Sequence, residues 1–211
     1  ASALNTNLIL LNSTSNRFPD GLGNDSGVLG KYICFHNYRG SMNGDLDGME
    51  DLYYKVSKPA ECIVANFSNL EKRDKDFYGG YVIYSGGYRE KLSDKHVQPL
   101  LGAGFKEAIS EPGTWGVYMY MQGETIAKES NHVRLSRDKK DQWGIPLLIT
   151  SVGYDDNDDK IVKDFLEQGQ LMLEAAGVKN INTNDSGQAP GLDIHEMGGV
   201  RMGKDPKTSL L

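Results

Sequence analysis

The sequence lacks several features that would assign a chain to an easily recognised class of protein. Only two cysteines, Cys34 and Cys62, occur in 211 residues, which is too few for a disulfide framework or a cysteine-ligated zinc site. We expect both to be small, buried apolar side chains. The uninterrupted apolar runs are short, whereas about 18 apolar residues are needed to cross a bilayer, so no membrane span is expected.

The sequence also lacks the glycine-rich motifs that bind nucleotide phosphates. Glycine is abundant, with 25 residues, but no GxGxxG stands between a strand and a helix, and no GxxxxGK[ST] occurs. Positive charge is scarce, because 23 Lys and Arg stand against 29 Asp and Glu. Neutralising nucleic-acid phosphates requires clustered cations, so a nucleic-acid partner is not expected.

The hydrophobic patterns predict an α+β fold with a mainly antiparallel sheet and flanking helices, because strands occur in clusters separated by few helices. Residues 40–51 are polar and glycine-rich, and we interpret them as an exposed excursion that is more plausibly an ordinary surface loop than a substrate lid. Helices are expected at residues 3–11, 97–110 and 155–177. Strands are expected at residues 32–38, 62–67, 80–85, 115–122, 133–135 and 147–154.

The strand predicted at residues 115–122 has two different faces. Trp115 and Met119 lie on one face with Val117 and Met121, whereas Tyr118 and Tyr120 lie on the other. One face must pack on the core, and the other can form a pocket wall. The sequence leaves open which face does which.

The acidic run at residues 155–159 resembles a calcium-binding loop only superficially. An EF-hand loop needs glycine at its sixth position and glutamate at its twelfth, where this chain has Lys160 and Leu166. Acidic residues at the start of a helix are favoured by the helix dipole. The run therefore predicts helix capping, and we expect no metal site.

Four histidines are present: His36, His96, His132 and His195. Imidazole is well suited to proton transfer because its unperturbed pKa is about 6.5. His195 ends an extended segment and is followed by small residues, so its ring can face a cavity. A single histidine in such a position is nevertheless more often structural than catalytic.

The residues around His195 change that interpretation. The segment HEMGGVRMGKDPKTS, residues 195–209, resembles the C-terminal signature H-x-x-G-[TG]-x-R-M-G-x-D-P-x-T-S of the glucose-methanol-choline (GMC) oxidoreductases. Three weaker blocks lie upstream in the same order as in that family, at residues 3–13, 26–36 and 124–135. They depart from the family pattern at Asn7, Phe35 and His132. The resemblance is closest to the bacterial branch that includes sugar and polyol dehydrogenases and pyranose oxidases.

This resemblance implies that the chain is one part of a flavoenzyme that oxidises an alcohol group of a sugar or polyol. Residues 1–30 would be the edge of the FAD domain, 31–190 the substrate-binding α+β domain, and 191–211 the start of an active-site segment. The Rossmann-like domain that holds most of the FAD would lie outside this chain, which is therefore not expected to retain FAD or to be active alone. The second active-site residue of the family, His or Asn, would lie beyond Leu211. The sequence leaves the compartment, bacterial cytoplasm or periplasm, undecided.

The resemblance also implies roles for individual residues. His195 would accept the substrate proton, while His36 would be mainly structural. Arg201 would contact substrate or flavin, or form a structural ion pair, and Glu124 matches a family position without an assigned chemistry. The remaining candidates are Tyr118 and Tyr120 for the substrate pocket, Asn5 and Thr6 near the adenosine half of FAD, and Gly198 and Gly199 for close approach to the flavin.

Two other functional classes compete with this interpretation. The chain could be a non-enzymatic binding or scaffold domain that retains the fold without the cofactor. It could also be an unrelated hydrolase that uses His195 with a carboxylate, although no GxSxG nucleophile motif supports that reaction. A GxGxxG upstream and an N-P-[ST] segment downstream in the full reading frame would favour the flavoenzyme.

Overall fold

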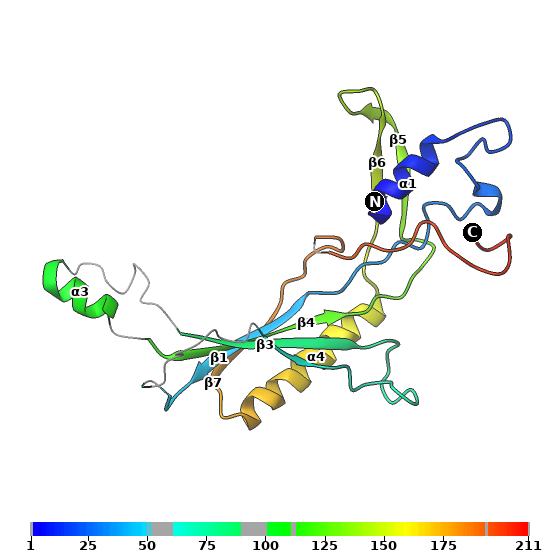
Figure 1. Cartoon of the computed structure of the whole chain (residues 1–211). Helices are drawn as coiled ribbons and strands as arrows, with labels where there is room; N and C mark the ends of the chain where they lie inside the picture. Colours follow the sequence, from blue (N-terminus) through cyan, green and yellow to red (C-terminus); the bar gives the residue numbers. More distant parts are fainter. Residues whose placement is uncertain are drawn as a thin grey trace.

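The computed structural model describes residues 2–49, 51, 61–89, 101–110, 113–192 and 194–210. It confirms the predicted α+β fold with a mainly antiparallel sheet (Figure 1). Five strands pair in the order β2-β3-β4-β1-β7, all antiparallel, and a separate hairpin pairs β5 with β6. The strands are β1 (Gly40–Leu46), β2 (Cys62–Val64), β3 (Tyr81–Arg89), β4 (Trp115–Gly123), β5 (His132–Lys140), β6 (Pro146–Ser151) and β7 (Lys179–Asp185).

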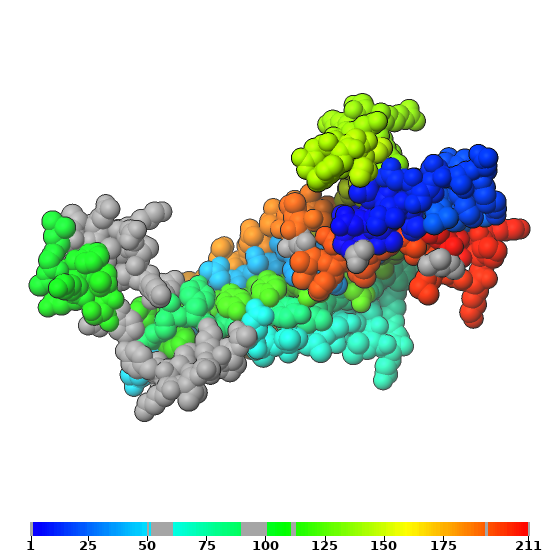
Figure 2. All heavy atoms as spheres, turned by 45° about the horizontal axis from the view of Figure 1, so that its top comes forward, coloured from blue at the N-terminus to red at the C-terminus, as the bar shows by residue number. Residues whose placement is uncertain are grey.

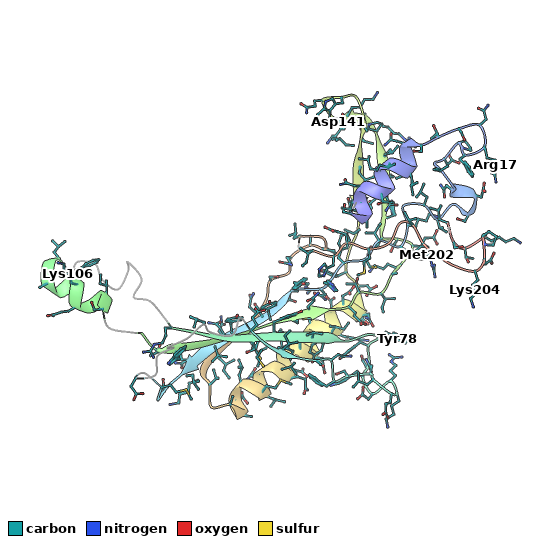
Figure 3. All side chains as sticks on the ribbon, in the orientation of Figure 1. Arg17, Tyr78, Lys106, Asp141, Met202 and Lys204 are labelled. Atoms are coloured by element: carbon teal, nitrogen blue, oxygen red, sulfur yellow. The ribbon has the colours of Figure 1, made fainter. Side chains whose placement is uncertain are left out.

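The helices agree well with the sequence pattern. They are α1 (Ala3–Asn12), the short 3-10 helix η1 (Asn24–Ser26), α3 (Gly102–Ser110) and α4 (Asp156–Ala175). Residues 97–100 of the helix predicted at residues 97–110 lie outside the described residues. α3 buries none of its side chains and lies away from the sheet and α4, as the position of Lys106 shows (Figures 1 and 3). Within the described part of the chain, no helix is both long and apolar enough to cross a membrane.

Two expectations about strands are wrong. Residues 40–46 are not an exposed excursion but β1, which pairs with β4 on one side and β7 on the other. Glycine is required there because a Cβ on Gly40 would lie 2.5 Å from the ring of Phe165 in α4. Residues 32–38, in contrast, are extended but form only isolated bridges, including Cys34 with Met197 and Asn37 with Gly123.

The main core lies between the five-stranded sheet and α4. Ile161, Phe165 and Leu173 of α4 are fully buried against Ile83, Met121 and their neighbours. Met119 and Met121 of β4 face this core, which places Tyr118 and Tyr120 on the opposite, open face of the sheet. Each fully buried aliphatic or aromatic side chain contributes about 1.5–3 kcal/mol, so the layer of α4 and sheet is the main stabilising unit.

The start of α4 confirms the predicted capping. The Asp155 side chain accepts a hydrogen bond from Asn157 N, and Asp158 accepts one from Asp155 N at 2.9 Å, which completes a capping box. Among the described residues, no group of three or more His, Cys, Asp or Glu side chains is placed to hold a metal ion. Asp158 is only 3% exposed, and this burial raises its pKa to about 6.

Replacing Asp158 with asparagine should therefore change how stability depends on pH. The native carboxyl binds a proton more tightly in the folded state than in the unfolded state, so its contribution to stability falls as pH rises from about 4 to 6. Asparagine keeps an oxygen that can accept from Asp155 N but cannot ionise. Relative to wild type, the free energy of unfolding of the variant should rise by about 1–3 kcal/mol when the pH is raised from 4.5 to 7.5. Urea unfolding at both pH values measures this change. Parallel pH profiles of the two proteins would contradict this account.

A second, smaller core joins α1 and residues 33–35 to the β5–β6 hairpin. Ile33, Phe35 and Val133 are buried there, and Leu4 and Leu148 pack against them. We call α1, residues 24–35 and the β5–β6 hairpin together the N-terminal cluster. The C-terminal segment, residues 194–210, lies along it, and Figure 2 shows this segment beside the N-terminal residues. Paired backbone bonds hold it there, between Cys34 and Met197 and from Gly199 N to Lys31 O.

The cysteines are free thiols in different surroundings. Cys34 is half-buried beside the C-terminal segment, and burial raises the pKa of its thiol. Cys62 is exposed on β2, so the expectation that both cysteines are buried is wrong for Cys62. β2 is an edge strand of only three residues, which explains why its side chains are poorly covered.

Candidate functional site

Two histidines meet where the N-terminal cluster joins the sheet. His36 Nε2 lies 3.0 Å from His195 Nδ1, and the rings are nearly perpendicular, with centroids 5.0 Å apart. The backbone explains this meeting, because the antiparallel bridge between Cys34 and Met197 places residues 36 and 195 opposite each other. Two residues 159 positions apart in the sequence thus form one unit.

The backbone of His195 adopts an unusual conformation. Its φ is 67°, in the left-handed region, which costs about 1 kcal/mol or more for a residue with a side chain. Backbone strain of this kind persists only where the surroundings impose it, and it is concentrated at functional sites. The residue is also exposed, so its second nitrogen, Nε2, can face a ligand.

A hollow of about 220 Å³ adjoins the histidine pair. His36 and Gln122 line it, and Gln122 Nε2 lies 3.5 Å from Nδ1 of His195, which is not itself a lining residue. A water molecule occupies about 30 Å³ in the liquid, so the hollow has room for about seven, the scale of a small polyhydroxy compound. The lining residues are His36, Asn66, Gly80, Tyr81, Val82, Tyr84, Gln122 and Glu124.

Several groups act on the protonation of His36. Burial lowers its pKa most, and the nearby His195 lowers it further, while the Gly123 carbonyl and the Glu124 carboxylate act in the opposite direction. The net effect is a pKa below the ordinary histidine value. His36 is therefore neutral at neutral pH, and a neutral ring can accept a hydrogen bond from His195.

The predicted substrate residues lie at different distances from the histidine pair. Glu124 lines the hollow, where its carboxylate packs against Gly79. Tyr120 stacks on Tyr84, a lining residue, with ring centroids 5.2 Å apart. Tyr118 lies one step further from the hollow, stacked on Tyr120. Figure 1 shows the two strands that carry these rings, β3 and β4, running side by side.

Glu61 connects the outer tyrosines. The hydroxyl of Tyr120 donates to Glu61 Oε1 at 3.0 Å, and that of Tyr118 to the same oxygen at 3.3 Å. Burial and this carboxylate raise the pKa of Tyr120 to about 12, so its phenol stays protonated in the physiological range. Both hydroxyl groups are thus bound to Glu61, and neither tyrosine is a lining residue of the hollow.

The predicted cofactor and arginine contacts lie outside the hollow. Arg201 stacks over the ring of Tyr32 at 4.7 Å from its centroid. Asn5 is exposed on α1, and the Thr6 hydroxyl donates to Ser2 O within the same helix. Neither the aromatic contact of Arg201 nor the helix bond of Thr6 involves the histidine pair.

Gly198 and Gly199 are required by the chain's own packing. Both have positive φ, 91° and 78°, and a Cβ on Gly198 would lie 2.0 Å from the Tyr32 carbonyl oxygen. A Cβ on Gly199 would lie 2.1 Å from Nδ2 of Asn7, which is fully buried. Asn7 donates to Ala3 O at 2.8 Å and to Gly198 O at 3.3 Å, which ties α1 to the segment that carries His195.

Sequence reasoning missed three features of this site. They are the contact of His36 with His195, the place of Gln122 beside that pair, and the bond from Asn7 to the segment that carries His195. Asn7 had a signal, because it replaces the proline that is usual at that position of the resembling pattern. A proline there could not donate the bond to Gly198 O. The position of Gln122, two residues after Tyr120 in an alternating strand, placed it on the open face of the sheet, but nothing in the sequence placed His195 beside it.

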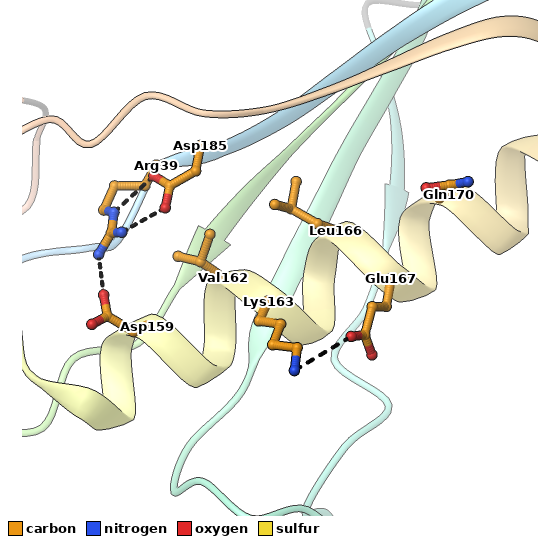
Figure 4. Close-up of a pocket in the computed structure, with 8 residues that line it drawn as sticks. All are labelled: Arg39, Asp159, Val162, Lys163, Leu166, Glu167, Gln170 and Asp185. Atoms are coloured by element: carbon orange, nitrogen blue, oxygen red, sulfur yellow. Dashed lines mark hydrogen bonds and ion pairs between the residues drawn. The ribbon is translucent and has the colours of Figure 1, made fainter.

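A second, larger hollow lies on the other side of the molecule, between α4 and β7 (Figure 4). Arg39 lines it, and its guanidinium binds both carboxylate oxygens of Asp185 and one of Asp159. These hydrogen bonds raise the pKa of Arg39 further above its ordinary value. Two carboxylates thus neutralise the Arg39 cation, and the other cation that lines this hollow of about 380 Å³, Lys163, forms an ion pair with Glu167 at 3.9 Å.

A flavin fits these residues only in part. The exposed His195 beside the hollow can form one wall of a site in which a flat ring system meets a substrate alcohol. In the described ranges, however, no glycine-rich turn joins a strand to the start of a helix, the arrangement that holds a dinucleotide pyrophosphate. Among the described residues, therefore, no arrangement of this kind is present to hold the nucleotide half of a flavin.

Comparisons with known proteins point to dehydrogenases of sugars and polyols. No protein-family model matches the chain. It is 26% identical over its full length to 2-methyl-1,2-propanediol dehydrogenase of Mycolicibacterium austroafricanum and 25% identical to the fructose dehydrogenase large subunit of Gluconobacter japonicus, covering 38% of each. It is 27% identical, over 53% of its length, to the gluconate 2-dehydrogenase flavoprotein of Pantoea cypripedii, covering 19% of that protein. The chain thus spans about two-fifths of the first two relatives, and the similarity supports a relationship to flavin-linked dehydrogenases of alcohol or sugar groups.

Proposed function

We propose that this chain is the substrate-binding portion of a GMC-type, FAD-dependent oxidoreductase that oxidises an alcohol group of a sugar or polyol. The observation that carries the proposal is the position of His195, whose exposed ring stands beside His36 and Gln122 at the edge of a hollow of polyol size. The similarity to a diol dehydrogenase and two sugar-acid or sugar dehydrogenases supports the same chemistry.

Oxidation of an alcohol removes a hydride from carbon and a proton from the hydroxyl group. FAD, when bound, accepts the hydride. His195 accepts the proton at Nε2, because its Nδ1 is directed at His36. Gln122 and Glu124 lie where they can bind the remaining hydroxyl groups of a substrate and so orient the reacting carbon.

The surface of the chain supports a missing partner that holds the FAD. Exposed apolar side chains of the N-terminal cluster and C-terminal segment include Ile9 and Met202, the latter labelled in Figure 3. We propose that residues 1–30 and 191–211 face the FAD-binding portion, that residues 31–190 bind the substrate, and that the chain alone is inactive.

A non-enzymatic scaffold domain is the competing proposal, and it would not need a strained, exposed histidine beside a hollow. The decisive experiment mixes the whole flavoprotein, without oxygen, with a panel of sugars and polyols and follows the flavin absorbance. Rapid bleaching by at least one compound, together with a colourless 211-residue chain, is expected. A whole protein that binds no flavin, or whose flavin no alcohol reduces, would rule out the proposed enzyme.

A further inference from the structure

The hollow beside the histidine pair carries an unbalanced charge. Glu124 is its only acidic lining residue, and no Lys or Arg lines it. Among the residues that the structure describes, Glu124 forms no ion pair. The hollow between α4 and β7 provides the contrast, because both of its cations, Arg39 and Lys163, are matched by carboxylates (Figure 4). Only the hollow beside the histidines presents an unneutralised carboxylate to a ligand.

We propose that this hollow binds neutral sugars and polyols in preference to sugar acids, and that Glu124 is the specificity-determining residue. That the ligand is a polyhydroxy compound rests on the proposed function. The similarity to known proteins leaves the charge of the ligand open. Two of the relatives are named for neutral compounds, a diol and fructose, and the third is named for gluconate, an anion.

The position of Glu124 is fixed by its own backbone and by a neighbouring glycine. Its N–H donates to Gly80 O at 2.9 Å. Its carboxylate lies over Gly79, where a Cβ would come within 2.5 Å of Oε2. The side chain is exposed, and its charge acts on the nearby ring of His36. The carboxylate is therefore held beside the proposed reaction centre and is accessible to a ligand.

Asn66, a second lining residue, suits hydroxyl groups better than carboxylates. Its Nδ2 donates to Ser68 O at 3.0 Å, and its Oδ1 accepts from Ser68 N at 3.1 Å. Ser68 is only 1% exposed, so this anchor is buried. One N–H and one lone pair of the fixed amide remain for a ligand in the hollow. A hydroxyl group can both donate and accept, whereas a carboxylate can only accept.

A sugar acid in this hollow would bring a second negative charge close to Glu124. A compact space of about 220 Å³ is only about 6 Å across. At that separation, the repulsion of two unit charges lowers affinity about 3-fold in bulk water and about 100-fold at a dielectric constant of about 20. The ion pair behind the lining residue Tyr81, Lys75 with Asp164 at 2.6 Å, is neutral as a unit and does not offset this repulsion.

The test compares D-gluconamide with D-gluconate, which have the same carbon chain and hydroxyl groups but differ in charge. Isothermal calorimetry on the whole flavoprotein gives both dissociation constants, whether or not either compound is oxidised. At low ionic strength, we expect wild type to bind the amide about 10-fold more tightly than the anion. This preference should fall towards unity in about 1 M salt, where charges are screened over about 3 Å.

Glu124→Gln keeps the length of the side chain and one acceptor oxygen but removes the charge. The two dissociation constants of this variant should differ by less than about threefold at low ionic strength. Glu167→Gln is the matched control, because it removes the same charge from α4, where Glu167 lines the other hollow. It should keep the wild-type ratio.

Wild-type protein that binds the anion as tightly as the amide, or a preference that persists in Glu124→Gln, would overturn the proposal. Failure of both compounds to bind at their solubility limits would also overturn it. The salt dependence is measured on wild type, so it decides the matter even if Glu124→Gln does not fold. If the amide is preferred but no alcohol bleaches the flavin, the proposed function fails while the charge preference stands.

Discussion

Replacing His195 with alanine is expected to slow flavin reduction by an alcohol substrate about 10²- to 10⁴-fold, the usual contribution of a positioned general base. The effect should fall on kcat more than on KM, because the hollow is lined by other residues, including Gln122 and Glu124. Stopped-flow measurement of flavin bleaching in the whole protein gives both quantities.

His132→Ala is the matched control, because it removes an imidazole from β5, where the ring forms a hydrogen bond with the backbone of Ser130. Its rate should stay within about threefold of wild type. If the His195→Ala protein reduces its flavin at a rate within tenfold of the wild-type rate, another group accepts the proton.

Comparison of His195→Gly with His195→Ala measures the backbone strain at this position. The glycine variant should be more stable by about 1 kcal/mol, since φ is positive.

Gly198→Ala should destabilise the chain by about 3 kcal/mol or more. The left-handed conformation accounts for about 1–2 kcal/mol, and the remainder comes from overlap with the Tyr32 carbonyl oxygen, which lies 2.0 Å from the added Cβ. The carbonyl cannot easily move, because the Lys31 and Cys34 pairings hold that stretch of backbone on both sides. For a chain of this size, we expect the midpoint of thermal unfolding to fall by about 6–12 °C.

Gly27→Ala separates the two contributions. Gly27 also has positive φ, 69°, but nothing lies within 4 Å of its added Cβ, so only the conformational cost of about 1 kcal/mol applies. Equal losses in the two variants would show that the contact with Tyr32 is unimportant. A larger loss of stability in Gly198→Ala would show that the contact with Tyr32 matters. If the nuclear magnetic resonance spectrum of that variant also shows loss of the His36–His195 contact, this glycine sets the position of the site.

The sequence predicted elements whose residues alone carry a periodic signal. α4 follows from its apolar stripe and its acidic start, and β4 from the alternation between Met119, Met121 and the tyrosines. β1 and β7 were missed because their sequences, GSMNGDL and KNINTND, are polar or rich in glycine. They form strands because Gly40 and Gly44 fit beneath α4 and Val178, a tertiary fact that no local pattern contains.

The site shows the same division between local and long-range information. The resemblance around residues 195–209 identified His195 as a candidate, and this candidate remains a prediction. The neighbours of His195 depend on two long-range pairings, Cys34 with Met197 and Asn37 with Gly123, which no local sequence window contains. The open face of β4 was also undecidable from sequence, because both of its faces can be buried.

The pairing of residues so distant in sequence also governs when the site can form. A ribosome adds about 5–20 residues per second, so His36 emerges about 10–30 s before His195, which follows 159 residues later. During that interval the nascent chain exposes one half of the histidine pair with no counterpart, while the hairpin and much of the sheet are already available to fold. The histidine pair is thus a late product of synthesis, and a chain interrupted before His195 would lack this contact.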